Sequence, residues 1–195
     1  MDGLGSPSRI GLLLPLHWQT VTLLLAGVAT GATVAVCADA EGLRTCDVAF
    51  VIAAQAGSAV DLGIDEVFAL SGHPFGGPVS SLAPMAQDYS REVPSYADAW
   101  SGPAPTTVTI EVADAPLGDL PELPVTTADR VLVDVDLTVR HGLAALLSVL
   151  RSGASLVLAP SPHGALDLAR TAADERVTAT LGLSVPGLRA LDIPP

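Results

Sequence analysis

The sequence predicts an α/β fold with a mostly parallel sheet built from β-α-β units. Two observations carry this prediction. Short apolar strands alternate with helical segments along the chain, and a helix, a Gly-Ala-small step and a strand follow one another twice, as AGVATGATVAV and SVLRSGASLVL. Strands joined through a helix lie parallel, with a right-handed crossover. Because 195 residues suit one ordinary domain, we expect a single α/β domain over residues 1–195.

The first β-α-β unit spans residues 9–36. Residues 9–14 form a short apolar run that ends at a proline, which is typical of a buried strand. Residues 17–30 carry an apolar stripe at helical spacing, and Gly31 is a helix stop signal. Residues 33–36 are then the strand that closes the unit.

The middle of the chain adds further strands and a long irregular segment. Residues 47–52 and 66–70 are apolar strand candidates on either side of a weak helix over 53–62. Residues 71–105 are rich in Gly, Pro, Ser and aromatic residues, and this segment is longer than an ordinary connection. Residues 106–112 alternate like a strand.

The second β-α-β unit spans residues 129–158. Its predicted parts are a strand over 130–135, a helix over 140–151 and a strand over 154–158. A helix over 164–174 and a strand over 177–181 follow.

The composition excludes several classes of function. All nine basic residues are Arg, so no P-loop lysine, kinase strand lysine or Schiff-base lysine is available in this chain. The formal net charge of -12 disfavours nucleic acid and anionic membrane surfaces, so we expect neither as a partner. Residues 10–36 are long and uncharged enough to resemble a membrane span, but their polar interruptions favour strand, helix and strand. We expect a cytoplasmic protein.

Cys37 and Cys46 are the only thiols. They do not form a CxxC motif, and no ligand cluster for zinc lies near them in the sequence. Two interpretations stay open, a disulfide or a pair of small reduced core residues, and the reduced pair is the more typical one. We expect no metal and no cofactor.

Two stretches resemble the N-terminal domain of the adenylate-forming (AMP-binding) superfamily, which includes acyl-CoA synthetases, luciferases and peptide-synthetase adenylation domains. They are DGLGSPSRIGLLLPLHWQTVTLLLAGVATGATVAV, over 2–36, and DRVLVDVDLTVRHGLAALLSVLRSGASLVLAP, over 129–160. The stretch SSLAPMAQDYSREVPSYADAW, over 80–100, is similar to a small uncharacterised bacterial family of truncated relatives. The resemblance implies the fold of a subdomain of that N-terminal domain.

The chain departs from the superfamily where its chemistry resides. The resemblance places a Ser/Thr/Gly-rich phosphate loop between residues 106 and 129, but that region reads TTVTIEVADAPLGDLPELPVTTAD and has no run of glycines. Asp136 and Val139 stand where the superfamily usually has a Pro and a pocket His, and His141 is displaced by two positions. The superfamily's N-terminal hairpin, its later motifs and its C-terminal domain with the catalytic Lys are absent from these residues. A truncated acyl-CoA synthetase-like gene product, with Met1 as an internal start, is therefore one alternative.

Polar residues at predicted strand ends are the candidate ligand-binding residues. Asp134 and Asp136 end a strand and His141 opens the next helix, an arrangement that suits a divalent ion or proton transfer. The alternative is that the carboxylates cap and the imidazole is solvated. His73 lies in the Gly-rich stretch 71–77, which is either a turn that closes over a ligand or a flexible tip. His17 and Trp18 are expected to pack at a helix start, and His163 has no assigned role.

These residues favour a degenerate adenylate-forming-like domain without adenylation activity. We expect it to act as a binding or partner module, either as a homodimer or with a partner protein, because the lost segments would leave apolar surface to cover. Its small-molecule ligand is unknown. The alternative is an enzyme of different or reduced chemistry that uses the acidic residues and His at the strand-end crevice. No catalytic residue is assigned.

Overall fold

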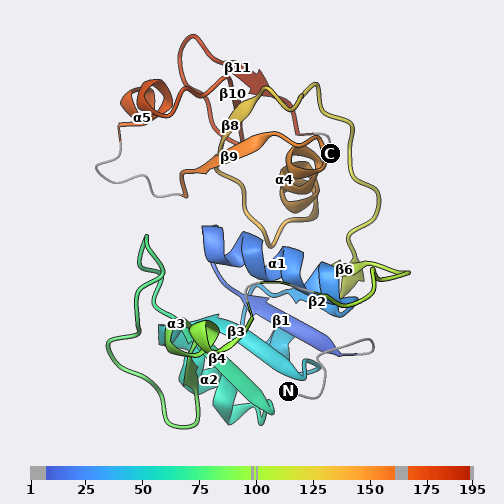
Figure 1. Ribbon diagram of the computed structural model, residues 1–195, viewed down its shortest axis with the longest axis vertical. Helices are drawn as coiled ribbons and strands as arrows, with labels where there is room; N and C mark the ends of the chain where they lie inside the picture. Colours follow the sequence, from blue (N-terminus) through green and yellow to red (C-terminus); the bar gives the residue numbers. More distant parts are fainter. Residues whose placement is uncertain (1–7, 98, 100, 161–166, 194–195) are drawn as a thin grey trace. The chain divides into compact units, whose positions relative to one another are not determined.

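The computed structural model describes residues 8–97, 99, 101–160 and 167–193, and the chain divides into two compact units, 1–116 and 117–195 (Figure 1). Each unit is built around its own sheet, and almost all strand pairs are parallel. The α/β class with mostly parallel pairing is therefore confirmed, with the strands divided between two sheets. The single domain over 1–195 stays a prediction, because two compact units can still unfold as one cooperative structure.

The first unit contains a seven-stranded sheet in the order β5-β4-β3-β1-β2-β6-β7. All of its pairs are parallel except the β6–β7 pair. The central strand is apolar and buried, with Leu12 fully inaccessible to solvent. The strands are β1 (Arg9–Leu13), β2 (Thr33–Val36), β3 (Val48–Ile52), β4 (Glu66–Leu70), β5 (Gln87–Asp88), β6 (Thr109–Val112) and β7 (Ala115–Pro116).

The helix α1 (Trp18–Thr30) connects β1 to β2. His17 caps its first turn by accepting from the Gln19 backbone N–H, and Gly31 ends it at φ 78°. Both features agree with the predicted start and stop signals. The other helical segments of this unit are short: η1 (Glu41–Leu43), η2 (Ala53–Gln55), α2 (Ala56–Asp61), α3 (Tyr89–Glu92) and η3 (Val93–Ser95).

The second unit contains a four-stranded, all-parallel sheet in the order β11-β10-β8-β9. The helix α4 (Arg140–Arg151) connects two of its strands and has the predicted bounds. Most side chains of α4 are buried because the helix packs on the sheet. The remaining elements are β8 (Arg130–Val133), β9 (Ser155–Leu158), α5 (Leu168–Asp174), β10 (Ala179–Leu181) and β11 (Arg189–Leu191).

The two units share one topology. In the first, β1-α1-β2 is a parallel crossover, and β3 then pairs with the other edge of β1. In the second, β8-α4-β9 repeats the crossover, and β10 pairs with the other edge of β8. In each sheet, the chain therefore adds its second strand on one side of the first strand and its third strand on the other side. In α/β proteins, ligands bind beyond the carboxyl ends of the strands where the strand order reverses in this way.

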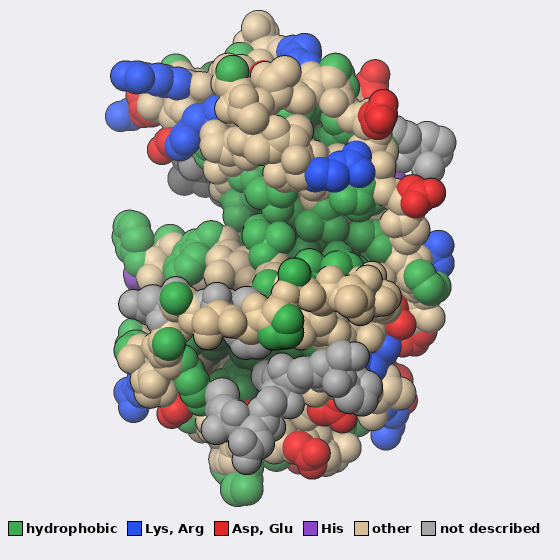
Figure 2. All heavy atoms as spheres, turned by 45° about the vertical axis from the view of Figure 1, so that its right-hand side comes forward, with side chains coloured by type: hydrophobic (Ala, Val, Ile, Leu, Met, Phe, Trp, Pro, Cys, Tyr) green, Lys and Arg blue, Asp and Glu red, His purple; other side chains and the backbone are tan. Residues whose placement is uncertain are grey.

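Among the described residues, no helix is long and apolar enough to cross a membrane. Figure 2 shows Arg side chains interspersed with Asp and Glu on the visible face, without one large patch of a single sign. His163 lies outside the described residues.

Candidate functional site

The strands β6 and β7 occupy the start of the region where the resemblance places a phosphate loop. They pair antiparallel, with Val112 opposite Ala115, so only Ala113 and Asp114 connect them. Both connecting residues have positive φ, 50° and 57°. Successive left-handed residues make the tight two-residue turn of a β-hairpin. The residues Ala113 and Asp114 therefore form a hairpin turn that contains no glycine.

Arg9 holds this hairpin against the sheet. Its guanidinium forms an ion pair with Glu111 of β6 and a second with Asp114 at 3.4 Å. Glu111 is only 20% exposed in its side chain, whereas Asp114 is 76% exposed. The pair with Glu111 is therefore the better shielded of the two. One guanidinium pairs with two carboxylates, so the net charge of these three side chains at the turn is negative.

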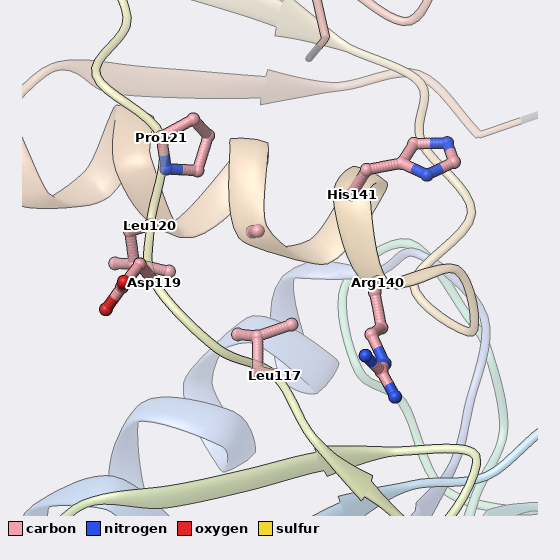
Figure 3. A pocket seen from close by; sticks show the side chains of 7 residues that line it. Leu117, Asp119, Leu120, Pro121, Arg140 and His141 are labelled. Atoms are coloured by element: carbon pink, nitrogen blue, oxygen red, sulfur yellow. The ribbon is translucent and has the colours of Figure 1, made fainter. Parts of the chain in front are cut away.

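The segment that follows the hairpin runs beside α4. Leu117, Asp119, Leu120 and Pro121 line a pocket of about 380 Å³ together with Arg140, His141 and Ala144 (Figure 3). The Arg151 guanidinium fixes the segment, because it donates to the backbone oxygens of Leu120 and Pro121 at 3.4 and 3.2 Å. All lining residues belong to the second unit. The pocket is thus a feature of one compact unit.

His141 projects from the first turn of α4 on the side away from the Asp119 carboxylate (Figure 3). It is exposed, and Arg140 precedes it at the start of the helix. The N-cap residue, Val139, supplies no side-chain acceptor for the free backbone N–H groups of that turn. Arg140 and His141 therefore give the lining of the pocket two side chains that can donate hydrogen bonds.

Of the two predicted carboxylates at the end of β8, that of Asp136 is engaged in a local turn. Asp136 accepts from the backbone N–H and the hydroxyl of Thr138, at 2.8 and 2.7 Å. The backbone N–H of Asp134 donates to Leu181 O at 2.9 Å. Neither residue is among those lining the pocket that contains His141. The structure therefore places these carboxylates near the strand end, as predicted, but His141 alone of the three lines this pocket.

His73 belongs to the first unit, in a turn that packs on the start of α1. The indole N–H of Trp18 donates to Pro74 O at 2.9 Å. A Cβ at Gly76 would lie 2.8 Å from both Trp18 and Gln19, so the turn contacts the helix closely. The imidazole of His73 accepts from the Phe75 backbone N–H at 3.2 Å. These contacts favour a docked turn over a flexible tip.

His17 lies beside the same turn. Burial lowers its pKa, and a hydrogen bond with the His73 backbone partly offsets that effect. Its Nδ1 accepts from the Gln19 backbone N–H at 3.3 Å, so this nitrogen carries no proton. The imidazole is therefore held as a neutral helix cap, which agrees with the predicted packing role.

A second pocket in the first unit was not anticipated from the sequence. It has a volume of about 320 Å³ and lies beyond the carboxyl ends of β2 and β6, where Cys37, Glu111 and Asp114 are among its lining residues. No sequence motif marks it, because it forms from strands that are adjacent in the sheet but distant in the chain. Within the described ranges, no group of three or more His, Cys, Asp or Glu residues is arranged to hold a metal ion.

Comparisons with known proteins agree with this architecture. No family model matches the chain. A Mycobacterium tuberculosis (strain ATCC 25618 / H37Rv) protein described as a TIGR03089 family protein is 33% identical over an alignment of 198 positions, gaps included, that covers 91% of this chain and 75% of that protein.

Three solved structures share the fold. A protein assigned as a long-chain-fatty-acid CoA ligase from Rhodopseudomonas palustris CGA009 has a TM-score of 0.65 at 16% identity, over 94% of this chain and 52% of its own. A coronafacic acid ligase variant from Pectobacterium brasiliense gives 0.63 at 12%, over 89% and 40%. The Mycobacterium tuberculosis fatty acyl CoA synthetase gives 0.59 at 15%, over 92% and 39%. This chain therefore spans about half or less of each ligase.

Proposed function

Because the chain belongs to the TIGR03089 family and its fold is that of acyl-CoA ligases, we propose that it is an adenylate-forming scaffold without adenylation activity that acts as a binding module. One observation carries the proposal. Where the resemblance places the phosphate loop, β6 and β7 are joined by the two-residue turn at Ala113 and Asp114.

This turn is a poor cradle for a triphosphate. A phosphate loop surrounds its ligand with successive backbone N–H groups, and glycines let the backbone come that close. The turn has two residues and no glycine. Its charge also opposes an anion, because Glu111 and Asp114 outnumber the single Arg9 that pairs with them. Each of these features weakens triphosphate binding at this place.

The absence of Lys from these 195 residues also argues against triphosphate binding at the turn. A guanidinium also binds phosphate, so an Arg with no other partner at the turn can take the place of the Lys. The Arg nearest the turn, Arg9, is already committed to carboxylates. In the described ranges of the chain, no second cation pairs with the carboxylates of the hairpin.

We assign the binding role to the pocket beside α4. Its wall carries Arg140 and His141 as donors, and Leu117 and Leu120 supply apolar surface. Small-molecule sites combine mostly apolar walls with a few convergent polar groups, and their volumes are typically ~300–1,000 Å³. At about 380 Å³ the pocket suits a small molecule with an acceptor group. The expected homodimer or partner protein stays a prediction.

ATP–pyrophosphate exchange with a panel of carboxylic acids tests the absence of adenylation. We expect no exchange above background from the pure chain, beside an active acyl-CoA ligase as positive control. Isothermal titration with Mg-ATP should likewise give no heat. Exchange that disappears in a variant of this chain with Asp134→Asn, Asp136→Asn and His141→Ala would contradict the proposal and favour the alternative enzyme.

A thermal-shift screen with small carboxylates tests the binding role. A ligand that raises the melting temperature of the parent should lose that effect in Arg140→Gln and His141→Ala. Arg170→Gln is the matched control, since Arg170 is exposed on α5 and does not line the pocket. Equal shifts of the melting temperature in the parent and the pocket variants would mean that the ligand binds outside this pocket.

A further inference from the structure

The helix α1 of the first unit exposes an uncharged, largely apolar face. Its exposed residues recur every three or four positions, so they lie on one side of the helix. They are Trp18, Thr22, Leu25 and Ala26, of which Trp18 is 47% and Leu25 is 42% exposed. A surface helix ordinarily carries charged or polar residues on its outer face. Residues 10–38 contain no Arg, Lys, Asp or Glu, so α1 has no charge on this face.

A loop lengthens this face at the start of α1. The indole N–H of Trp18 donates to Pro74 O at 2.9 Å, which holds the loop beside the exposed indole. Phe75, the next residue of the loop, is 87% exposed. Residues 67–87 also contain no Arg, Lys, Asp or Glu. The loop and the helix therefore form one uncharged surface, here called the α1 strip, made of Trp18, Thr22, Leu25, Ala26 and Phe75.

The ion pair in the middle of this sheet lies on the opposite face. A Cβ at Gly27 of α1 would lie 3.6 Å from Ile10, so α1 covers the face of β1 that carries Ile10. A Cβ at Gly11 would instead meet η1, because successive side chains of a strand point to opposite faces. Arg9 shares the face of Gly11 for the same reason, and it pairs with Glu111. The helix α2 also lies on that side of the sheet, away from α1 (Figure 1).

We propose that the α1 strip is the interface of a homodimer, in which a second copy of this chain packs its own α1 strip against the first. A two-fold interface brings the same surface of each copy together. Because the formal net charge is -12, two copies repel one another unless they meet where neither is charged. The α1 strip meets this condition, and it keeps the ion pair of Arg9 and Glu111 on the far side of each sheet. The interface does not depend on the pocket beside α4.

The face of one helix makes a small interface. Standard interfaces bury ~800 Å² on each partner, whereas α1 with its 13 residues is only about 20 Å long. We therefore expect a weak, reversible dimer whose share of the protein rises with concentration. Added salt should strengthen the dimer, because it screens the repulsion between two acidic chains. A basic partner protein at the same strip would show the opposite dependence on salt.

Sedimentation velocity of the whole chain over a range of concentrations tests the proposal. We expect a shift from monomer to dimer, with a smaller dissociation constant in about 0.5 M than in about 0.05 M NaCl. Leu25→Asp should raise the dissociation constant at least ~10-fold, because it buries an unpaired carboxylate of each copy in the interface. Ala26→Glu should have the same effect, and glutamate is a good helix former, so α1 should persist in this variant.

Leu82→Asp is the matched control for Leu25→Asp. Leu82 is also 42% exposed, but its neighbours Val79 and Ala83 pack in the core cluster on the face of the sheet opposite α1. The dissociation constant of Leu82→Asp should therefore equal that of the parent. Thermal melts followed by circular dichroism should show that the variants are folded. Equal weakening by Leu25→Asp and Leu82→Asp would mean that added charge, and not the α1 strip, decides dimerisation, and the proposal would be wrong.

Cross-linking with a flexible bismaleimide locates the interface. Ala26→Cys should link two chains through position 26, whereas Leu82→Cys and the parent should not, because Cys37 and Cys46 are buried. A dimer detected by sedimentation that Ala26→Cys fails to link would contradict an interface at α1. A chain that is monomeric at every concentration would overturn the proposal as well. If that monomer binds an added amphipathic peptide of Leu and Lys through the α1 strip, the strip belongs to a basic partner and not to a second copy.

Discussion

Gly182 lies so close to Asp134 that a Cβ at position 182 would stand 1.9 Å from the Asp134 backbone oxygen. Gly182 also has φ 78°, which residues with a side chain adopt at a cost. Gly182→Ala therefore combines backbone strain with a clash against backbone that cannot rotate away. We expect it to lower the free energy of unfolding by about 3 kcal/mol or more, measured by urea denaturation.

Gly187 is the matched control for this substitution. It has φ 85°, but an added Cβ meets nothing within 4 Å. Gly187→Ala should carry only the conformational cost of a left-handed alanine, about 1 kcal/mol. If the two variants unfold at the same urea concentration, the close packing of Gly182 against Asp134 does not contribute to stability.

The parts of the fold that were predicted correctly have strong local signals. Gly31 and Gly153 both follow long helices and have φ 78° and 79°, as expected of helix stop residues. The strands β5, β7 and β11 were not predicted, because strands of two or three residues show no periodicity. The turn at Ala113 and Asp114 was missed because it lacks the glycine that usually marks such a hairpin.

The candidate site could be predicted only in part. His141 was identified because it opens a helix after a strand, which is a local pattern. The pocket around it also needs Leu117 and Leu120, whose position beside α4 depends on Arg151 reaching the backbone some thirty residues earlier in the chain. The carboxylate of Asp136 looked like a ligand in sequence, but two local hydrogen bonds from Thr138 use it in a turn.

Asp129 makes the stability of the protein depend on acid pH. The Thr126 backbone N–H, the Thr178 hydroxyl and then the Arg189 guanidinium lower the pKa of its carboxyl. A carboxyl whose pKa is depressed by folding stabilises above its unfolded pKa of about 4, and that stability is lost as the pH falls below it. Asp129→Asn should cost about 1–3 kcal/mol at neutral pH, and its difference from the parent should shrink below about pH 4.

Asp174→Asn is the control for this pH profile. Its carboxylate is 70% exposed and pairs with Arg170 across one helical turn of α5 at 3.5 Å. An exposed pair of this kind contributes little, about 0–1 kcal/mol. Urea denaturation at a series of pH values should therefore separate the two variants. A constant difference between Asp129→Asn and the parent across that range would contradict the assigned role of Asp129.

The expected single domain has a spectroscopic test. Trp18 lies on α1 of the unit 1–116, and the sequence has no tryptophan after residue 100, so tryptophan fluorescence follows that unit, whereas far-UV circular dichroism reports on both. If the chain unfolds as one domain, the two signals should follow one curve. Leu181→Ala in the other unit should then lower the fluorescence midpoint too, as Leu12→Ala does directly. A biphasic dichroism curve would show two independently folding domains.

Substitution of the buried residue Thr180 should stabilise the protein. It is fully inaccessible to solvent in β10, and its hydroxyl has no hydrogen-bond partner in the described part of the chain. Thr180→Val removes an unsatisfied polar group while keeping the shape, so the free energy of unfolding should rise by about 1 kcal/mol. Thr178→Val is the matched control, because that hydroxyl donates to Asp129 and accepts from the Arg130 backbone N–H. Urea denaturation should show opposite shifts for the two variants, and a loss of stability in Thr180→Val would mean that its hydroxyl is bonded in solution.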